Sequence, residues 1–329
     1  MKAATFTLLF LLTLVCSSWQ QPHQDKPKQK TIKIAVISDL NSSYGSTKYH
    51  PDVYETLKEL DSIKPDIILC GGDMVAGQKA SITAAQTKAM WNSFDENVLK
   101  PIQQMKVPFG FTVGNHDASP SYQQDRKLAQ EFWLSKQQQL GLNFVDKTNF
   151  PFYFSYQQNG IFFISWDAAG SKVPQEVFDW MEKQLQSKVA KKAKLRVLLG
   201  HLPLYAIVAS KNKTGEVLTD TETTANFFKK HGIDLYISGH QHAYFPASSD
   251  KLRLLNAGCI GEGARPLLGD TRPATRAYTM IEVPVNNATQ FNYKTYVPNT
   301  GKTIELSQLP DTVVGFNGVS RKDVLARTL

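Results

Sequence analysis

The chain has 329 residues, of which 42% are apolar and 20% are charged, and its formal net charge at pH 7 is +8. This length allows one large α/β domain or two smaller ones, and the composition is that of a folded protein rather than a disordered or fibrous chain. A positive charge favours phosphate-rich partners. The lysines are scattered, however, and form no stripe with aromatic residues, so specific nucleic-acid binding is not expected.

The first 21 residues have the layout of a secretory signal peptide. Lys2 is followed by an apolar stretch over residues 3–15 and then by the small residues Cys16, Ser17 and Ser18. A single positive charge, a short apolar run and a cleavage site with small residues are typical of such peptides. The apolar run is also short for a membrane span. We expect cleavage between Ser18 and Gln21, and therefore a secreted or periplasmic protein with no transmembrane span after removal of the signal.

Two other interpretations of the N-terminus stay open. Cys16 offers the lipid-modified cysteine of a bacterial lipoprotein, although residues 12–15 lack the small residue usual just upstream. A buried N-terminal helix is disfavoured because a polar stretch over residues 20–30 separates the apolar run from the first strand. That composition predicts a flexible lead over residues 22–30.

From residue 31 onward, apolar periodicity and turn residues predict alternating strands and helices. Helices are expected at residues 52–63, 81–105, 122–139 and 174–187. Single strands are expected at residues 32–37, 66–70, 109–113, 195–199, 235–238 and 252–256. Residues 152–156 and 161–166 should form a hairpin around Asn159 and Gly160, and residues 278–283 and 291–297 should form a closing antiparallel pair.

This alternation indicates an α/β fold, in which two packed sheets carry helices on their outer faces. The later, closely spaced strands suggest that the second sheet is more antiparallel than the first. Because no linker divides residues 31–297, we predict one catalytic domain there, followed by a C-terminal tail over residues 298–329 to which we assign no structure.

Five short polar motifs each follow a buried apolar strand. Strand ends in α/β sheets are where ligands and catalytic groups gather, so we expect the five loops to converge if neighbouring strands share a direction. The motifs are Asp39-Leu40-Asn41, Gly71-Gly72-Asp73, Gly114-Asn115-His116-Asp117, Gly200-His201 and Gly239-His240-Gln241-His242.

Together the motifs offer carboxylates, amides and imidazoles, which suit Zn, Fe, Mn or Co. No thiolate is among them, which argues against a structural zinc site. A pair of divalent ions needs a shared ligand, and a carboxylate can supply it. Each motif alone is commonly a turn or loop, but all five in this order predict a binuclear metal site.

The series resembles the calcineurin-like metallophosphoesterase superfamily, which includes the purple acid phosphatases, over about residues 31–297. The resemblance implies a four-layer sandwich of two mixed β-sheets flanked by helices, with the metal site at the C-terminal ends of the strands. It also implies the ligands: Asp73 bridging both metals, Asp39 and His242 on the first metal, and Asn115, His201 and His240 on the second.

The resemblance further implies a mechanism in which a metal-bridging hydroxide attacks phosphorus in line with the leaving group. His116 would not bind metal, but would stabilise the phosphate oxygens or protonate the leaving alcohol. The expected function is therefore hydrolysis of phosphate monoesters or diesters, with a phosphorylated small molecule as substrate. The alternative is a non-catalytic member that binds a metal or a phosphorylated ligand.

Two positions depart from the family pattern. Asn41 stands where a histidine is usual, so it either binds the first metal through its amide oxygen or leaves that metal one ligand short, and we expect weaker or different occupancy there. Ala76 stands where the purple acid phosphatases have a ligand tyrosine, so membership of that subclass is not expected.

Three residues are candidates for binding the substrate. Arg265 lies in a glycine-rich loop over residues 258–270 and is suited to grip a phosphate. Tyr44 and Tyr205 each lie close to a motif.

Overall fold

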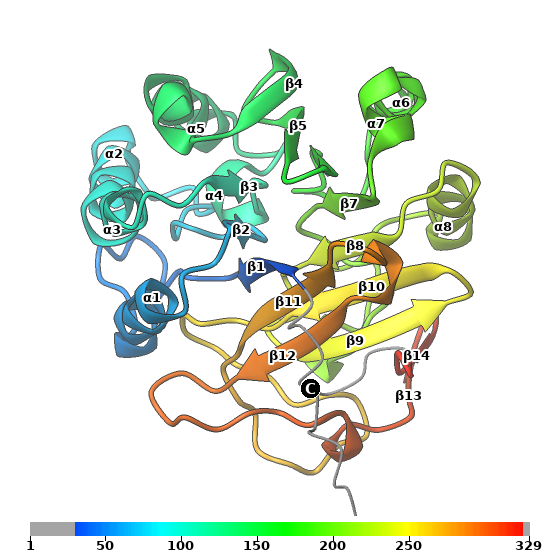
Figure 1. Cartoon of the computed structure of the whole chain (residues 1–329). Coiled ribbons are helices and arrows are strands. Elements are labelled where there is room, and N and C mark those ends of the chain that lie inside the picture. Colours follow the sequence, from blue (N-terminus) through cyan, green and yellow to red (C-terminus); the bar gives the residue numbers. More distant parts are fainter. Residues whose placement is uncertain (1–29, 325–329) are drawn as a thin grey trace, which may run out of the picture.

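The computed structural model describes residues 30–324, in which two large sheets lie at the centre and helices lie outside them (Figure 1). The first sheet has the order β12-β11-β1-β2-β3. Its strands β1 (Thr31–Ile37), β2 (Ile67–Cys70) and β3 (Phe109–Phe111) are parallel, whereas β11 (Tyr278–Pro284) and β12 (Asn292–Tyr296) are antiparallel to their neighbours. Mostly apolar sequences form β1 to β3, as expected for strands covered on both faces.

The second sheet has the order β4-β5-β6-β7-β8-β10-β9. Its centre is parallel and its two edges are antiparallel, so the sheet is mixed. The predicted hairpin is confirmed, because β5 and β6 meet at Asn159 and Gly160, which both have positive φ. The strands are β4 (Asn143–Asn149), β5 (Tyr153–Gln158), β6 (Ile161–Ser165), β7 (Leu195–Leu199), β8 (Leu235–Ser238), β9 (Tyr244–Ser249) and β10 (Leu252–Ala257).

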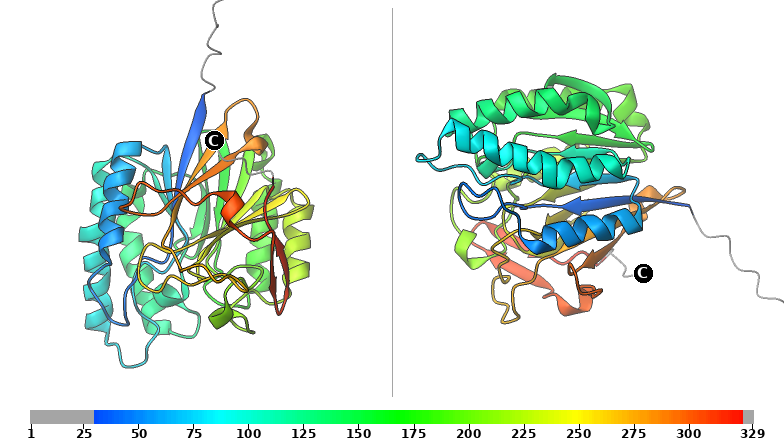
Figure 2. Two further views of the ribbon diagram at one scale, coloured as in Figure 1. Left: turned by 90° about the horizontal axis from the view of Figure 1, so that it is seen from below. Right: turned by 90° about the vertical axis from the view of Figure 1, so that its left-hand side faces the viewer.

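Helices cover the outer faces of the paired sheets, one group beside the first sheet and one beside the second (Figure 2). The predicted four-layer sandwich is therefore confirmed. The first group is α1 (Pro51–Ile63), α2 (Ala84–Phe94), α3 (Lys100–Gln104) and α5 (Gln123–Lys136), and the second is α6 (Gln175–Gln186), α7 (Lys188–Lys192) and α8 (Thr221–Lys230). Across residues 30–324 we find no helix with the length and apolar character that a membrane crossing requires.

The structure refines several predicted elements. The helix expected at residues 81–105 is interrupted by a π-turn at Asp95–Leu99. The turn ends directly before α3, whose second residue, Pro101, has no N–H to donate to the helical ladder. The antiparallel pair β11 and β12 exists, but it extends the first sheet beside β1. No sequence pattern predicted β4, β9 or α8.

The C-terminal segment contains a hairpin of β13 (Thr312–Gly315) and β14 (Gly318–Arg321). Lys322 forms a β-bridge with Ala247 of β9, and the buried side chains of Arg253 and Asp323 form an ion pair. This part of the tail is therefore fixed to the second sheet. The predicted signal peptide, and the predicted lead up to residue 29, lie outside the described residues and stay predictions.

An aromatic cluster joins α5 to the sheets. Trp133 is fully buried, and its ring is stacked on Phe111 of β3 with a centroid distance of 3.7 Å. Phe94 of α2 contacts the same indole edge-on at 5.7 Å. The cluster thus holds two helices against the strand that ends next to the Asn115 and His116 loop.

Replacement of Trp133 by alanine should destabilise the protein by about 3–5 kcal/mol, because the large cavity left between α5 and β3 cannot collapse fully. Urea denaturation measures this loss. Leu134→Ala is the matched control, since Leu134 is the next residue of the helix and is 53% exposed; its cost should stay below about 1 kcal/mol. Equal costs for the two variants would contradict the packing described here.

Candidate metal centre

The five polar motifs lie together where the two sheets meet. Three follow β1, β2 and β3 of the first sheet, and two follow β7 and β8 of the second. Hydrogen bonds join the loops: the Asp39 N–H donates to Gly72 O at 2.9 Å, and the Gly239 N–H donates to His201 O at 3.0 Å. The His240 N–H reaches across to the Asp39 carboxylate at 3.1 Å. The parallel strands therefore bring the motifs to one place, as expected.

Two groups of potential ligands result, and they share one residue. The first contains Asp39, Asp73 and His242, and the second contains Asp73, His201 and His240. All of these side chains are buried, and within each group the ligand atoms lie within 4.8 Å of one another. The shared carboxylate is the one that a pair of adjacent ions requires.

The Asp73 carboxylate is fully buried, yet only half of it is hydrogen-bonded. Oδ1 accepts the His116 N–H at 2.9 Å, whereas Oδ2 accepts no hydrogen bond and lies 3.3 Å from His201 Nε2. Burial alone would raise the pKa of Asp73, but His201 and then His116 outweigh it and hold the pKa below its usual range. A buried anionic oxygen without a donor is costly unless a cation is bound there.

Each histidine of the two groups has one ring nitrogen anchored to a protein acceptor. His201 Nδ1–H donates to Gly71 O at 2.7 Å, and His242 Nδ1–H donates to Gly263 O at 3.1 Å. His240 Nε2–H donates to Glu216 Oε2 at 2.7 Å. These bonds orient the rings, so that the opposite nitrogens face the carboxylates and Asn115, as in metal-binding histidines.

Asn115 adds an oxygen to the second group. Its Oδ1 lies 3.0 Å from His201 Nε2 and 2.8 Å from His240 Nδ1. Its amide donates to Gln78 Oε1 at 2.5 Å, which fixes the oxygen toward the histidines. Several lone-pair atoms thus converge on one point, which is unfavourable without a proton or a cation between them.

Burial and neighbouring charges shift the pKa values of the candidate ligands in different directions. Burial and then the nearby Lys211 lower the pKa of His240 to about 3, so this ring is neutral, as a metal ligand must be. Burial opposes a charged His201, but Asp73 raises its pKa to about 9. Burial would also raise the pKa of Asp39, but His242 outweighs it and the pKa is lowered.

The backbone is strained at four of the candidate ligands, because Asp39, Asp73, His240 and His242 all have positive φ. Such conformations cost about 1 kcal/mol or more for a non-glycine residue and cluster at functional sites. Gly239 is required for close approach, since a Cβ there would lie 2.1 Å from Ser38 Oγ and 2.6 Å from Asp39 Oδ2. The donor types and their arrangement fit divalent transition metals.

Asn41 is placed beside the first group through its backbone. Its N–H donates to Asp73 O at 3.1 Å, and its carbonyl accepts the Glu262 N–H at 3.1 Å. Its side chain is buried and forms no hydrogen bond to any of residues 30–324. Its part in binding the first metal stays a prediction.

His116 occupies the rim of the same site. Its Nδ1–H donates to Gly77 O at 3.1 Å, its Nε2 lies 4.0 Å from Asp73 Oδ2, and its ring contacts Tyr44 with centroids 5.2 Å apart. Asp117, the next residue, is structural: its carboxylate accepts the N–H groups of Met74, Val75 and Gly114. Burial and then Asp73 raise the pKa of Asp117 to about 7.

A cavity of about 490 Å³ opens beside these residues. His116, Asn115 and His240 line it, together with two of the residues predicted to bind substrate, Tyr44 and Arg265. Tyr205 is not among its lining residues and lies against Gly318 of the C-terminal hairpin. No contact of Tyr205 with the site supports the role predicted for it.

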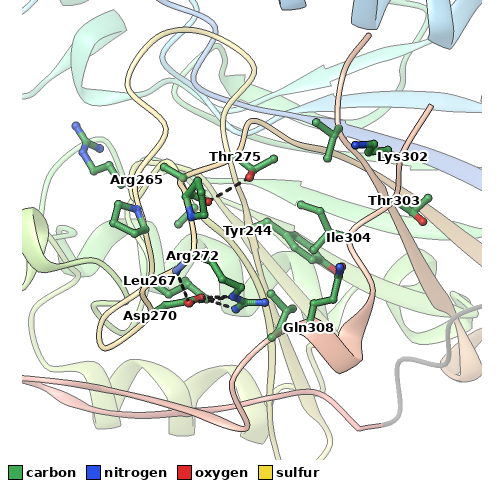
Figure 3. Close-up of a pocket in the computed structure, with 16 residues that line it drawn as sticks. Tyr244, Arg265, Leu267, Asp270, Arg272, Thr275, Lys302, Thr303, Ile304 and Gln308 are labelled. Carbon is green, nitrogen blue, oxygen red and sulfur yellow. Dashed lines mark hydrogen bonds and ion pairs between the residues drawn. The ribbon is translucent and has the colours of Figure 1, made fainter. Parts of the chain in front are cut away.

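A second cavity, of about 350 Å³, lies between the loop over residues 258–277 and the segment after β12 (Figure 3). Arg265 belongs to the lining of both cavities. Figure 3 shows its side chain extending away from Arg272, Asp270 and the other labelled residues, and its guanidinium reaches toward His240 O at 3.5 Å. The charge of Arg265 therefore belongs to the metal-centre cavity.

Three residues of this site were not predicted from the sequence. Lys211 and Glu216 lie in the loop after β7, contact His240 and line the cavity. Gln241 receives the N–H groups of Ile207 and Val208. Lys211 and Glu216 belong to no strand-end motif, and Gln241, which stands between two predicted ligands in one of the motifs, was assigned no role.

The profile of the calcineurin-like phosphoesterase family matches residues 32–244. The match covers well over half of the chain, and the chain therefore belongs to the calcineurin-like phosphoesterase family, as its motifs predicted. Members of this family use divalent metals, in agreement with the two ligand groups. A comparison with curated proteins finds no match.

Solved structures of the same fold include purple acid phosphatase PPD1 from yellow lupin, GAP50, the anchor in the inner membrane complex of Plasmodium, and a dimetal phosphatase from Danio rerio. Their TM-scores are 0.63, 0.55 and 0.52, and their sequence identities are 14%, 16% and 10%. The matches cover 84%, 84% and 83% of this chain, and 53%, 87% and 98% of the other chains. This chain thus spans about half the length of the lupin enzyme, and at these identities the likeness establishes the fold alone.

Metal ions should stabilise the protein through these groups. At about 100 times its dissociation constant, a bound Mn or Zn ion adds about 3 kcal/mol to the free energy of unfolding. Asp73→Asn should remove most of the gain and of the bound metal, whereas His201→Ala should affect only the second group. Thermal unfolding and elemental analysis measure both quantities, with Asp311→Asn, an exposed aspartate, as control. Full metal content in Asp73→Asn would contradict the assignment of the shared ligand.

Asn41→His should increase metal occupancy at the first group, since an imidazole is a stronger ligand than a neutral amide oxygen. Calorimetric titration with Mn or Zn should show a rise of about tenfold or more in affinity for one metal and little change for the other. Unchanged stoichiometry and affinities would show that Asn41 does not limit metal binding.

Proposed function

We propose that this protein is a binuclear metal-dependent hydrolase of phosphate esters. The observation that carries the proposal is the pair of buried ligand groups that share Asp73. A carboxylate common to two groups of imidazole and carboxylate donors is the arrangement that two-metal phosphoryl-transfer chemistry requires. Family membership supports the same reaction class.

The first metal would be held by Asp39, Asp73 and His242, with Asn41 as a further candidate ligand. The second would be held by Asp73, Asn115, His201 and His240. When bound, divalent ions lower the pKa of a coordinated water and neutralise the phosphoryl oxygens. The anchoring bonds to Gly71, Gly263 and Glu216 orient the three histidines beforehand, so little reorganisation is needed when a substrate arrives.

His116 would act on the substrate directly. Its Nδ1–H is fixed on Gly77 O, which leaves Nε2 for the cavity. A proton on Nε2 is placed to stabilise charge on a phosphate oxygen or to pass to the leaving alcohol oxygen. The His116 backbone N–H meanwhile holds Asp73 Oδ1, so this residue connects the substrate to the shared ligand.

The substrate would be a small phosphorylated molecule, because the cavity of about 490 Å³ has the size of a small-ligand pocket. From the signal-like residues 1–21 we also infer that the chain is exported. In that case its substrates lie outside the cytoplasm.

A non-catalytic member of the family is the second candidate. Asn41 favours it, because a first metal bound with one ligand fewer supports catalysis poorly. The retained His116 at the cavity argues against it. Turnover by the metal-loaded protein decides between the two.

The protein loaded with Mn, Fe, Zn or Co should hydrolyse p-nitrophenyl phosphate, bis(p-nitrophenyl) phosphate or both. His116→Ala should lower kcat about 10²- to 10⁴-fold with unchanged metal content, since the loss falls on proton transfer or charge stabilisation. His231→Ala, which lies at the end of α8 away from the cavity, is the control. Absence of turnover with every metal would leave the non-catalytic candidate standing.

A further inference from the structure

Lys211 places a positive charge at the metal-centre cavity. It belongs to the 3-10 turn Ala209–Lys211 after β7, and its side chain is 12% exposed. Its Nζ lies 3.2 Å and 3.3 Å from the two ring nitrogens of His240, and both residues line the cavity with Arg265. The amine therefore lies next to a candidate ligand of the second metal.

Among residues 30–324, the His240 ring is the one group within hydrogen-bond distance of this amine. His240 Nδ1 is turned toward Asn115 Oδ1, and Nε2 is the donor to Glu216. The Glu216 carboxylate lies 3.8 Å from Lys211 Nζ, which is an ion pair but too long for a hydrogen bond. An ammonium has three N–H donors, and the His240 ring can accept at most one of them, so the others are available to a ligand in the cavity.

The loop that carries Lys211 is fixed in place at several points. Gln241 Oε1 accepts the N–H groups of Ile207 and Val208 at 3.0 and 3.2 Å, and Gln241 Nε2 donates to Glu216 O at 3.2 Å. The Phe316 N–H of the C-terminal hairpin donates to Asn212 Oδ1 at 2.7 Å. Lys211 is thus held over the site before any ligand binds, which lowers the entropic cost of binding.

We propose that Lys211 and Arg265 together bind the non-bridging oxygens of a phosphate monoester dianion and make the site selective for monoesters over diesters. The proposal rests on the proposed function and deepens it. His116 lies elsewhere on the cavity lining, so the phosphate would be enclosed by the histidine, the metal ligands and the two cations.

The number of phosphate oxygens explains the selectivity. A monoester has three non-bridging oxygens and a charge close to −2, whereas a diester has two such oxygens and a charge of −1. Metal ions held by the two ligand groups would neutralise the oxygens nearest to them, and a remaining non-bridging oxygen would need a cationic donor from the protein. A diester carries its second alkyl or aryl group on that oxygen, which then has no negative charge, and would leave donors of the buried lysine unpaired in the cavity.

Lys211→Met, which keeps the length of the side chain but removes its charge, tests this role. The variant should lower kcat/KM for p-nitrophenyl phosphate about 10- to 100-fold, and for bis(p-nitrophenyl) phosphate less than about threefold. Lys211→Arg should recover part of the monoester activity. Lys213→Met is the matched control, because Lys213 belongs to the same loop and pairs with Glu216 at 4.0 Å but is 66% exposed; it should change neither rate.

Calorimetric binding of inorganic phosphate to the metal-loaded protein gives a readout that does not depend on turnover. Lys211→Met should weaken this binding about tenfold or more while its metal content and metal affinity stay unchanged. If the wild type hydrolyses neither ester, the proposed function fails, and phosphate binding still decides the role of Lys211.

Four results would overturn the proposal. They are a wild-type preference for the diester, equal losses for both esters in Lys211→Met, unchanged or absent phosphate binding, and loss of metal affinity in Lys211→Met. The last result would make the lysine a support for His240 instead of a ligand for phosphate.

Discussion

The burial of the Asp73 carboxylate between two sheets is the constraint on which the rest of the site depends. Removing an ionised carboxylate from water costs several kcal/mol unless donors or cations surround it. Here the His116 N–H and the His201 ring supply part of that compensation, and Oδ2 remains without a hydrogen bond. A metal-binding role explains both why this costly burial is tolerated and why the carboxylate is incompletely hydrogen-bonded.

The architecture places this carboxylate where each sheet contributes something different. The parallel strands β1, β2 and β3 end in the two aspartates and Asn115, and β7 and β8 end in the three histidines. The first sheet thus supplies mainly oxygen ligands and the second supplies nitrogen ligands. Oxygen and nitrogen ligands come together only because the two sheets pack face to face. The sandwich is therefore needed to form the mixed ligand set.

Much of the fold and the ligand set could be predicted because their signals are local. A β-branched run such as that of β1 marks a buried strand wherever it occurs, and a short polar motif directly after it indicates a strand-end loop. The strands that were missed lack this signal. In β4, exposed and partly buried residues alternate at a sheet edge, and α8 is rich in threonine and aromatic residues that form helices only moderately well.

The cationic part of the site escaped prediction for a different reason. Lys211 and Glu216 owe their positions to Gln241 and to the hairpin residue Phe316, which lie far away in the chain. A lysine in a polar loop has no sequence feature that distinguishes it from a solvated one, such as Lys213. Tyr205 illustrates the opposite case: proximity to His201 in sequence suggested a pocket role, but the ring packs on Gly318.

The order of the ligands along the chain has a consequence for how metal and folding are coupled. Among the aspartates and histidines of the two groups, the only two close in sequence, His240 and His242, belong to different groups. The unfolded chain therefore has no ready-made chelate, unlike a zinc finger with its closely spaced ligand pairs. Contacts such as that between Asp39 and His240, 201 residues apart, form only when both sheets have assembled. Metal should consequently bind the native state almost exclusively, with little competition from the unfolded chain and no part in starting its folding.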